Sequence, residues 1–227
     1  MNLAEHYHNL YQDSIRKIIS DEYQIDKLIH FPGDHRLGIT LIIRPGNQVK
    51  NKIQGFLDEL KAIDPCQYYY PDSDIHVTLM SIISCYEGFD LSGISIADYV
   101  EVINEILTDQ KGFEIEFKGI TASPSCIMIQ GFFKDDTLNG LRDRLRMKFR
   151  SLALQQTIDA RYAIQTAHST VVRFCKPISG KSDFIDVLEK YRDYPFGTFK
   201  VNSVFLVCND WYQRERATKE LYTFNLA

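Results

Sequence analysis

The order of predicted strands and helices recurs once along this chain. In each half, a strand with a histidine near its start is followed by an amphipathic helix and then by two strands typical of a hairpin. The halves share little identity beyond four residues, so the repeat is one of elements rather than of sequence. This order predicts an α+β fold with two pseudo-symmetric lobes. Each lobe is expected to be a small, mostly antiparallel sheet with helices outside, and a cleft is expected between the lobes.

Alternating stretches predict strands, and apolar residues at helical spacing predict helices. The predicted strands cover residues 37–44, 75–83, 113–120, 126–133, 168–174, 198–210 and 220–226, and the predicted helices cover residues 49–60, 96–107, 138–152 and 184–191. Residues 3–29 read as an amphipathic helical segment, and a Pro-Gly turn separates it from the rest. We therefore expect a helical extension at residues 1–35 and one bilobal domain at residues 36–227.

Composition excludes several classes of protein. Hydrophobic residues make up 44% of the chain and charged residues 25%, which is typical of a globular protein rather than a disordered or fibrous one. The net charge of −4 provides no basic field for coating duplex nucleic acid. Neither a G-x-G-x-x-G sequence nor a P-loop is present, which argues against a Rossmann enzyme or a nucleoside triphosphatase.

Localisation follows from the apolar runs and the cysteines. The apolar runs stay well below the roughly 18 residues that a membrane span needs, and the first residues lack the apolar stretch of a secretory signal. The five cysteines are scattered and contain no C-x-x-C pair, which predicts free thiols. We expect a cytoplasmic protein without membrane association, and no stable protein partner is evident.

Two tetrapeptides of the form His-x-Thr-apolar stand at equivalent places in the two halves, HVTL at residues 76–79 and HSTV at residues 168–171. Side chains at positions i and i+2 of a strand point to the same face. In each tetrapeptide the histidine and the threonine therefore face one way, and the apolar fourth residue faces the core. If the halves face each other, one cleft receives two imidazoles and two hydroxyls. These predicted site residues are His76, Thr78, His168 and Thr170.

The matched pair of motifs resembles the signature of the two-histidine (2H) phosphoesterases, which include 2′-5′ RNA ligase-like proteins and cyclic phosphodiesterases. The resemblance covers about residues 37–227 and leaves the N-terminal extension unexplained. Many members carry leucine at the fourth place of both motifs and arginine at the sixth place of the second. Here Val171 replaces that leucine, and Arg173 stands where the arginine is expected. Strand parity turns Arg173 away from the cleft unless the strand bends.

The resemblance implies a phosphoesterase that needs no metal or other cofactor. Its substrate is a 2′,3′-cyclic phosphate or a 2′-5′ phosphodiester of a nucleotide or RNA end. In-line attack on phosphorus needs one group to take a proton and another to give one, and histidine suits both because its ordinary pKa is about 6.5. Threonine hydroxyls can donate to the non-bridging oxygens. The sequence leaves open which histidine is the acid, and whether the enzyme hydrolyses or ligates.

Further candidates for substrate binding lie near the motifs. Aromatic rings can stack on bases, and basic side chains can contact phosphates. These candidates are Arg173, Tyr70, Tyr86 and Trp211. Core packing of Tyr70 and a polar surface turn around Trp211 are the competing interpretations. The basic run at residues 142–150 is interpreted as a solvated helix face, with RNA contact as the less favoured alternative.

Two other readings of the motif pair remain open. The same cleft could bind a nucleotide or RNA end without turning it over, in which case the protein is a binding module. Alternatively, the two motifs are a coincidence in an unrelated α+β protein.

Overall fold

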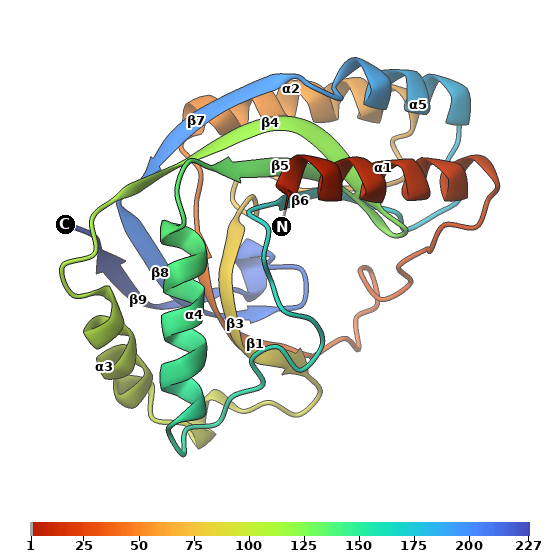
Figure 1. Ribbon diagram of the computed structural model, residues 1–227. Coiled ribbons are helices and arrows are strands. Elements are labelled where there is room, and N and C mark those ends of the chain that lie inside the picture. Colours follow the sequence, from red (N-terminus) through yellow and green to blue (C-terminus); the bar gives the residue numbers. More distant parts are fainter. Residues whose placement is uncertain (1) are drawn as a thin grey trace.

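The computed structural model describes residues 2–227 of the chain (Figure 1). Its strands are β1 (Leu37–Ile43), β2 (Tyr68–Tyr69), β3 (Val77–Tyr86), β4 (Phe113–Ser123), β5 (Cys126–Phe133), β6 (Ser169–Arg173), β7 (Pro195–Val201), β8 (Ser203–Asp210) and β9 (Lys219–Asn225). Its α-helices are α1 (Leu3–Ile19), α2 (Asn47–Ile63), α3 (Ile96–Leu107), α4 (Thr137–Arg150) and α5 (Lys181–Lys190). None of the helices in this range is long and apolar enough to span a membrane.

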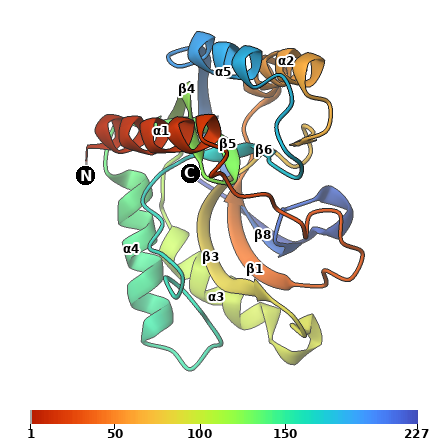
Figure 2. The ribbon, with the colours of Figure 1, turned by 90° about the vertical axis from the view of Figure 1, so that its right-hand side faces the viewer.

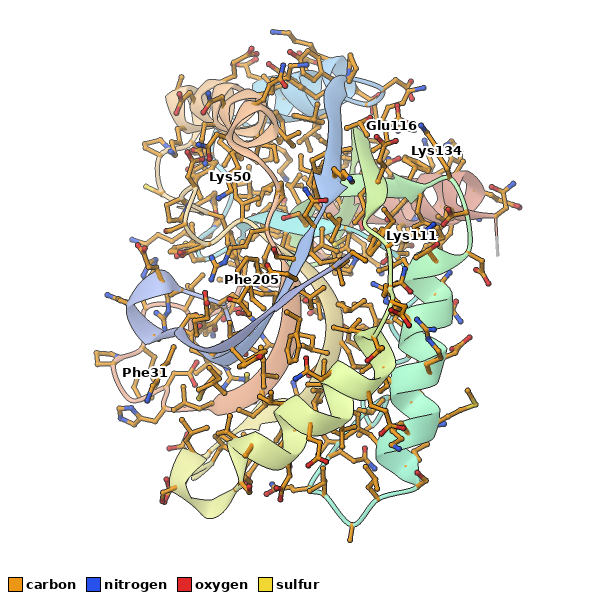
Figure 3. The ribbon with its side chains drawn as sticks, turned by 90° about the vertical axis from the view of Figure 1, so that its left-hand side faces the viewer. Phe31, Lys50, Lys111, Glu116, Lys134 and Phe205 are labelled. Atoms are coloured by element: carbon orange, nitrogen blue, oxygen red, sulfur yellow. The ribbon has the colours of Figure 1, made fainter. Side chains whose placement is uncertain are left out.

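Two antiparallel sheets form the two lobes. One sheet has the strand order β3-β1-β8-β9, and the other has the order β2-β6-β5-β4-β7. Helices α3 and α4 pack side by side on the first lobe, and α1, α2 and α5 lie on the second (Figures 1 and 3). The prediction of an α+β fold with two lobes of sheet and helix is confirmed.

The two halves of the chain are interlaced rather than consecutive. The hairpin β8–β9, from the C-terminal half, completes the sheet that contains β1 and β3. The hairpin β4–β5, from the N-terminal half, completes the sheet that contains β6. Each sheet therefore takes its histidine-motif strand from one half and a hairpin from the other.

One predicted strand proves to be two. Residues 198–210 were expected to form a single strand, but the chain leaves one sheet at Asn202, so that β7 pairs with β4 and β8 pairs with β1. Strand β7 alternates between exposed and buried residues, whereas β8 is buried almost throughout. The pattern of a single segment does not reveal a change of sheet, because alternation reports burial and not the identity of the neighbouring strand.

The N-terminal helix is shorter than predicted and packs directly on a sheet. Helix α1 ends at Ile19, and its buried residues Tyr7, Tyr11 and Ile18 face β4 and the second lobe. The Ser14 hydroxyl on the same face donates to the Ala122 carbonyl of β4 at 2.9 Å. The irregular segment after α1 then runs beside the end of β6.

Strand β3 is irregular against its neighbour β1. The β1 residues pair with β8 in unbroken register, but the pairing of β1 with β3 shifts at three places. At each shift β3 carries one residue more than β1, which is the definition of a β-bulge. One shift lies between Leu37 and Ile39 of β1. A Cβ atom added at Gly38, between them, would lie 2.3 Å from the Ile83 carbonyl oxygen and 2.8 Å from the Cys85 nitrogen. Glycine is thus required at residue 38 by close backbone approach.

We predict that Gly38→Ala lowers the free energy of unfolding by about 2 kcal/mol, because the new methyl group overpacks against the β3 backbone. Gly55→Ala is the matched control, because residue 55 lies within α2 and an added Cβ there meets nothing within 4 Å. That control should raise the free energy of unfolding by about 0.5–1 kcal/mol. Urea unfolding measures both, and equal effects in the two variants would contradict the close approach.

Candidate active site

Residues of both His-x-Thr motifs line a single cavity between the two sheets. The cavity volume is about 170 Å³, and its lining includes the four predicted residues His76, Thr78, His168 and Thr170. All four side chains are half-buried, whereas their neighbours Val77, Leu79, Ser169 and Val171 are fully buried. In both lobes, strand alternation therefore directs the histidine and threonine side chains to the cavity and their neighbours to the core.

The His76 ring is held by a backbone carbonyl. Its Nδ1 lies 2.7 Å from the Asp74 carbonyl oxygen, which can only accept, so Nδ1 carries the hydrogen and Nε2 remains for a ligand. Burial lowers the pKa of His76, because the charged ring loses hydration; the Asp74 carbonyl opposes this shift, and the positive charges of Arg44 and Arg173 add to it.

The His168 ring is held by a hydroxyl. Its Nδ1 lies 2.6 Å from Thr166 Oγ1, and a hydroxyl can either donate or accept, so both ring tautomers are accommodated. Burial, and to a lesser degree the neighbouring basic groups with Arg142 first among them, lower the pKa of His168 to about 4. Both imidazoles are therefore neutral at pH 7. A bound phosphate would favour their charged forms.

A β-bulge turns Arg173 into the cavity. In the pairing of β5 with β6, Ile127 lies opposite Val172 but the next residue, Met128, lies opposite Thr170, so Val171 is the extra residue. The bulge resets the alternation, with the result that Arg173 shares the cavity with Thr170. Simple strand parity, which pointed Arg173 away from the cleft, fails here for this reason.

Two protein groups orient the Arg173 guanidinium. Its Nε donates to the Tyr70 hydroxyl at 3.2 Å, and its Nη1 lies 3.8 Å from Asp26 Oδ2 in the segment after α1. The same carboxylate accepts from the Tyr212 hydroxyl at 2.9 Å. Tyr70 is only 1% exposed, so it positions Arg173 and does not offer an open ring for base stacking.

Of the two remaining candidates for substrate binding, one lines the cavity and the other does not. Trp211 lines the cavity, and its ring lies against the guanidinium groups of Arg36 and Arg161. Tyr86 lies outside the cavity, contrary to expectation, because β3 turns its side chain toward Phe89, and its hydroxyl accepts from Gln155. Within residues 2–227, no group of three or more His, Cys, Asp or Glu side chains could hold a metal ion.

Arg142 supports the site from behind, and its sequence-based placement was wrong. It was placed on a solvated helix face, but its side chain is completely buried in the structure. Its Nε donates to the Leu79 carbonyl at 3.0 Å, and its Nη2 donates to the carbonyls of Thr78 and Thr166 at 2.9 Å each. Burial lowers the pKa of Arg142 to about 10, because the charged guanidinium loses hydration, and the positive charge of Arg146 acts in the same direction.

One guanidinium thus binds the backbone of the first motif and that of Thr166, two residues before the second motif. Thr78 and Leu79 belong to the first motif, and Thr166 supplies the hydroxyl that contacts His168. A signal in the sequence was available, because Arg142 lies four residues after Leu138 and so shares the apolar face of α4.

No family model matches this sequence, and no curated protein matches it. Solved structures do match. LigT from E. coli, in a complex with 3′-AMP, has a TM-score of 0.57 at 13% identity, and the match covers 85% of this chain and 99% of LigT. The protein TT0787 of Thermus thermophilus has a TM-score of 0.58 at 13% identity, with coverage of 83% and 97%. A conserved Agrobacterium tumefaciens protein of unknown function has a TM-score of 0.60 at 15% identity, with coverage of 93% and 98%.

These matches define the fold of the chain. It is the two-lobed α+β fold of LigT, in agreement with the fold class predicted from the sequence.

We predict that Arg142→Met lowers the free energy of unfolding by about 3 kcal/mol, because three buried carbonyls lose their donor. Arg144→Met is the matched control on the same helix, since Arg144 is exposed and donates only to the Gln110 side chain. The control should change stability by less than about 0.5 kcal/mol. Urea unfolding measures both variants, and a similar small effect of the two would mean that Arg142 is dispensable for holding the motifs.

Proposed function

We propose that the protein is a metal-independent phosphoesterase. Its substrate is a 2′,3′-cyclic phosphate or a 2′-5′ phosphodiester of a nucleotide or RNA end. The observation that carries the proposal is the meeting of two imidazoles and two threonine hydroxyls, from opposite sheets, in one cavity. The known fold supports it, because LigT shares that fold and has been solved with a nucleotide bound. We assign the activity to residues 36–227 of a cytoplasmic protein, with residues 1–35 as an extension.

The proposed chemistry follows from the positions of the hydrogen-bonding groups. The reacting phosphate lies between the two rings, and the hydroxyls of Thr78 and Thr170 donate to its non-bridging oxygens together with Arg173. One imidazole takes the proton of the attacking hydroxyl or water through Nε2. The other gives a proton to the sugar oxygen as its bond to phosphorus breaks.

The two histidines differ in the state that their partners favour. His76 keeps its hydrogen on Nδ1, so in its neutral form Nε2 is free to accept a proton. His168 can carry its hydrogen on either nitrogen, because the Thr166 hydroxyl adapts. The proposed mechanism requires one acidic proton on the pair, so the apparent pKa values of the pair belong to both rings.

We predict that His76→Ala and His168→Ala each lower kcat by about 10²–10⁴, the usual contribution of a positioned acid or base. His35→Ala, a change at an exposed histidine outside the cavity, should leave kcat unchanged. The assay is a screen of 2′,3′-cyclic nucleotides, 2′-5′ dinucleotides and RNA with cyclic ends, with and without EDTA, and activity should survive EDTA. Binding without turnover by the unaltered protein would favour a non-catalytic module, and activity restored only by added metal would contradict the mechanism.

We also predict a bell-shaped dependence of kcat/KM on pH with its maximum below pH 7. Productive protein has one neutral and one charged imidazole, and burial lowers the pKa of both rings. As pH rises through these lowered values the acid loses its proton, so the rate falls; as pH drops below them the base becomes protonated and the rate falls again. Initial rates at limiting substrate measure the curve. A maximum on the alkaline side, or a flat profile, would contradict the lowered pKa values.

A further inference from the structure

Strand β3 presents a hydroxyl to the cavity at every third residue. Thr78, Ser81 and Ser84 are half-buried and line the cavity, and the two residues between each pair are buried. A regular strand repeats every two residues, so a period of three requires an extra residue in each interval. The register shifts against β1 supply these extra residues.

The spacing of the hydroxyls follows from β1, which is regular. Thr78 lies opposite Ile42 of β1, and Ser81 lies opposite Thr40. Ser84 lies beside Gly38. Successive hydroxyls are therefore two β1 residues apart, on the order of 6.6 Å. This is comparable to the length of one extended nucleotide, and the row continues well past the phosphate held between the histidines.

None of these three hydroxyls is used by the protein. In the part of the chain that the structure describes, the side-chain oxygens of Thr78, Ser81 and Ser84 have no hydrogen-bond partner, although all three border the cavity. Each is free to donate to or accept from a ligand.

A fixed loop forms one wall beside this row. The segment between α4 and β6 is fastened to β3 by two bonds: the Thr157 amide donates to the Ile82 carbonyl at 2.8 Å, and the Ser84 amide donates to Thr157 Oγ1 at 2.7 Å. The loop after β8, with Trp211, lies on the other side of the curved strands β1 and β3 (Figure 2). The part of the cavity that follows β3 between these two loops is called the trough.

The far end of the trough carries a positive charge without a counter-charge. Arg161 donates to the Cys85 carbonyl at 3.0 Å, and its guanidinium lies 4.2 Å from the centre of the Trp211 ring. Arg36 also lies against this ring, but Asp34 neutralises it through two bonds of 2.7 Å. Among residues 2–227, no carboxylate lies within ion-pair distance of Arg161.

We propose that this trough, from Thr78 to Arg161, binds the sugar–phosphate backbone of single-stranded RNA, so that the preferred substrate is an oligonucleotide and not a mononucleotide. The inference rests on the proposed function, which places the reacting phosphate at the histidine end. The hydroxyls of Ser81 and Ser84 bind the sugars and phosphates of the next nucleotides, and the Arg161–Trp211 pair receives a phosphate and a base at the far end.

The experiment compares substrates of one to four nucleotides that end in a 2′,3′-cyclic phosphate. We expect kcat/KM to rise with length. Arg161→Met should lower the value for the tetranucleotide about tenfold, the effect of losing a charged hydrogen bond, while the mononucleotide changes less than twofold. The double variant Ser81→Ala/Ser84→Ala should likewise lower kcat/KM for the tetranucleotide more than for the mononucleotide. Arg144→Met, on the exposed face of α4, is the charge-matched control and should change neither substrate.

Binding is measured separately, by calorimetry with oligonucleotides that end in a 3′-phosphate. Arg161→Met should reduce the slope of log K against log salt by about 0.7, the value for one phosphate contact on a single strand. Trp211 is the only tryptophan of the chain, so its fluorescence should respond to the tetranucleotide and not to the mononucleotide.

The outcomes separate the trough from the proposed activity. Turnover that does not depend on length, or an equal loss on both substrates in Arg161→Met, overturns the trough and leaves the phosphoesterase intact. Length-dependent binding that Arg161→Met abolishes, without turnover of any substrate, supports the trough and overturns the activity.

Discussion

The arrangement of the site depends on one buried guanidinium. Arg142 reaches from α4 to the backbone of β3 and to Thr166, just before β6, and so connects the two sheets behind the cavity. A buried charge without a carboxylate is costly, and that cost is offset here by the bonds that the guanidinium donates to three backbone carbonyls. The same contact links the backbone of the first His-x-Thr motif to Thr166, whose hydroxyl contacts His168 of the second.

The bulges in β3 and β6 are the second constraint on the site. They explain why the directions of some site side chains were predicted correctly and that of Arg173 was not. Alternation within a strand correctly separated His76 and Thr78 from the buried Leu79, since no bulge lies between the first two. The same rule failed for Arg173, because the bulge at Val171 shifts the alternation by one. A bulge depends on the register with a neighbouring strand, and that register is not encoded in the strand's own pattern.

The fold could be predicted in class and in most elements. Amphipathic spacing located α2 to α5, and alternation located most of the strands, because burial on one face leaves a local signal. The exchange of hairpins could not be foreseen, since it concerns which distant segments pair. The burial of Arg142 was visible in part, through its spacing from Leu138, but a basic run normally indicates a solvated face.

The interlacing of the halves has a consequence for how this chain reaches its native state. Leu37 pairs with Asp210, and Tyr68 pairs with Arg173, so neither sheet can close until segments from opposite ends of the chain have met. Contacts of such large sequence separation slow the search, because the entropy of closing long loops is lost before the strands are stabilised. A ribosome that has released only the N-terminal half has released no complete lobe, because each sheet still lacks strands from the C-terminal half.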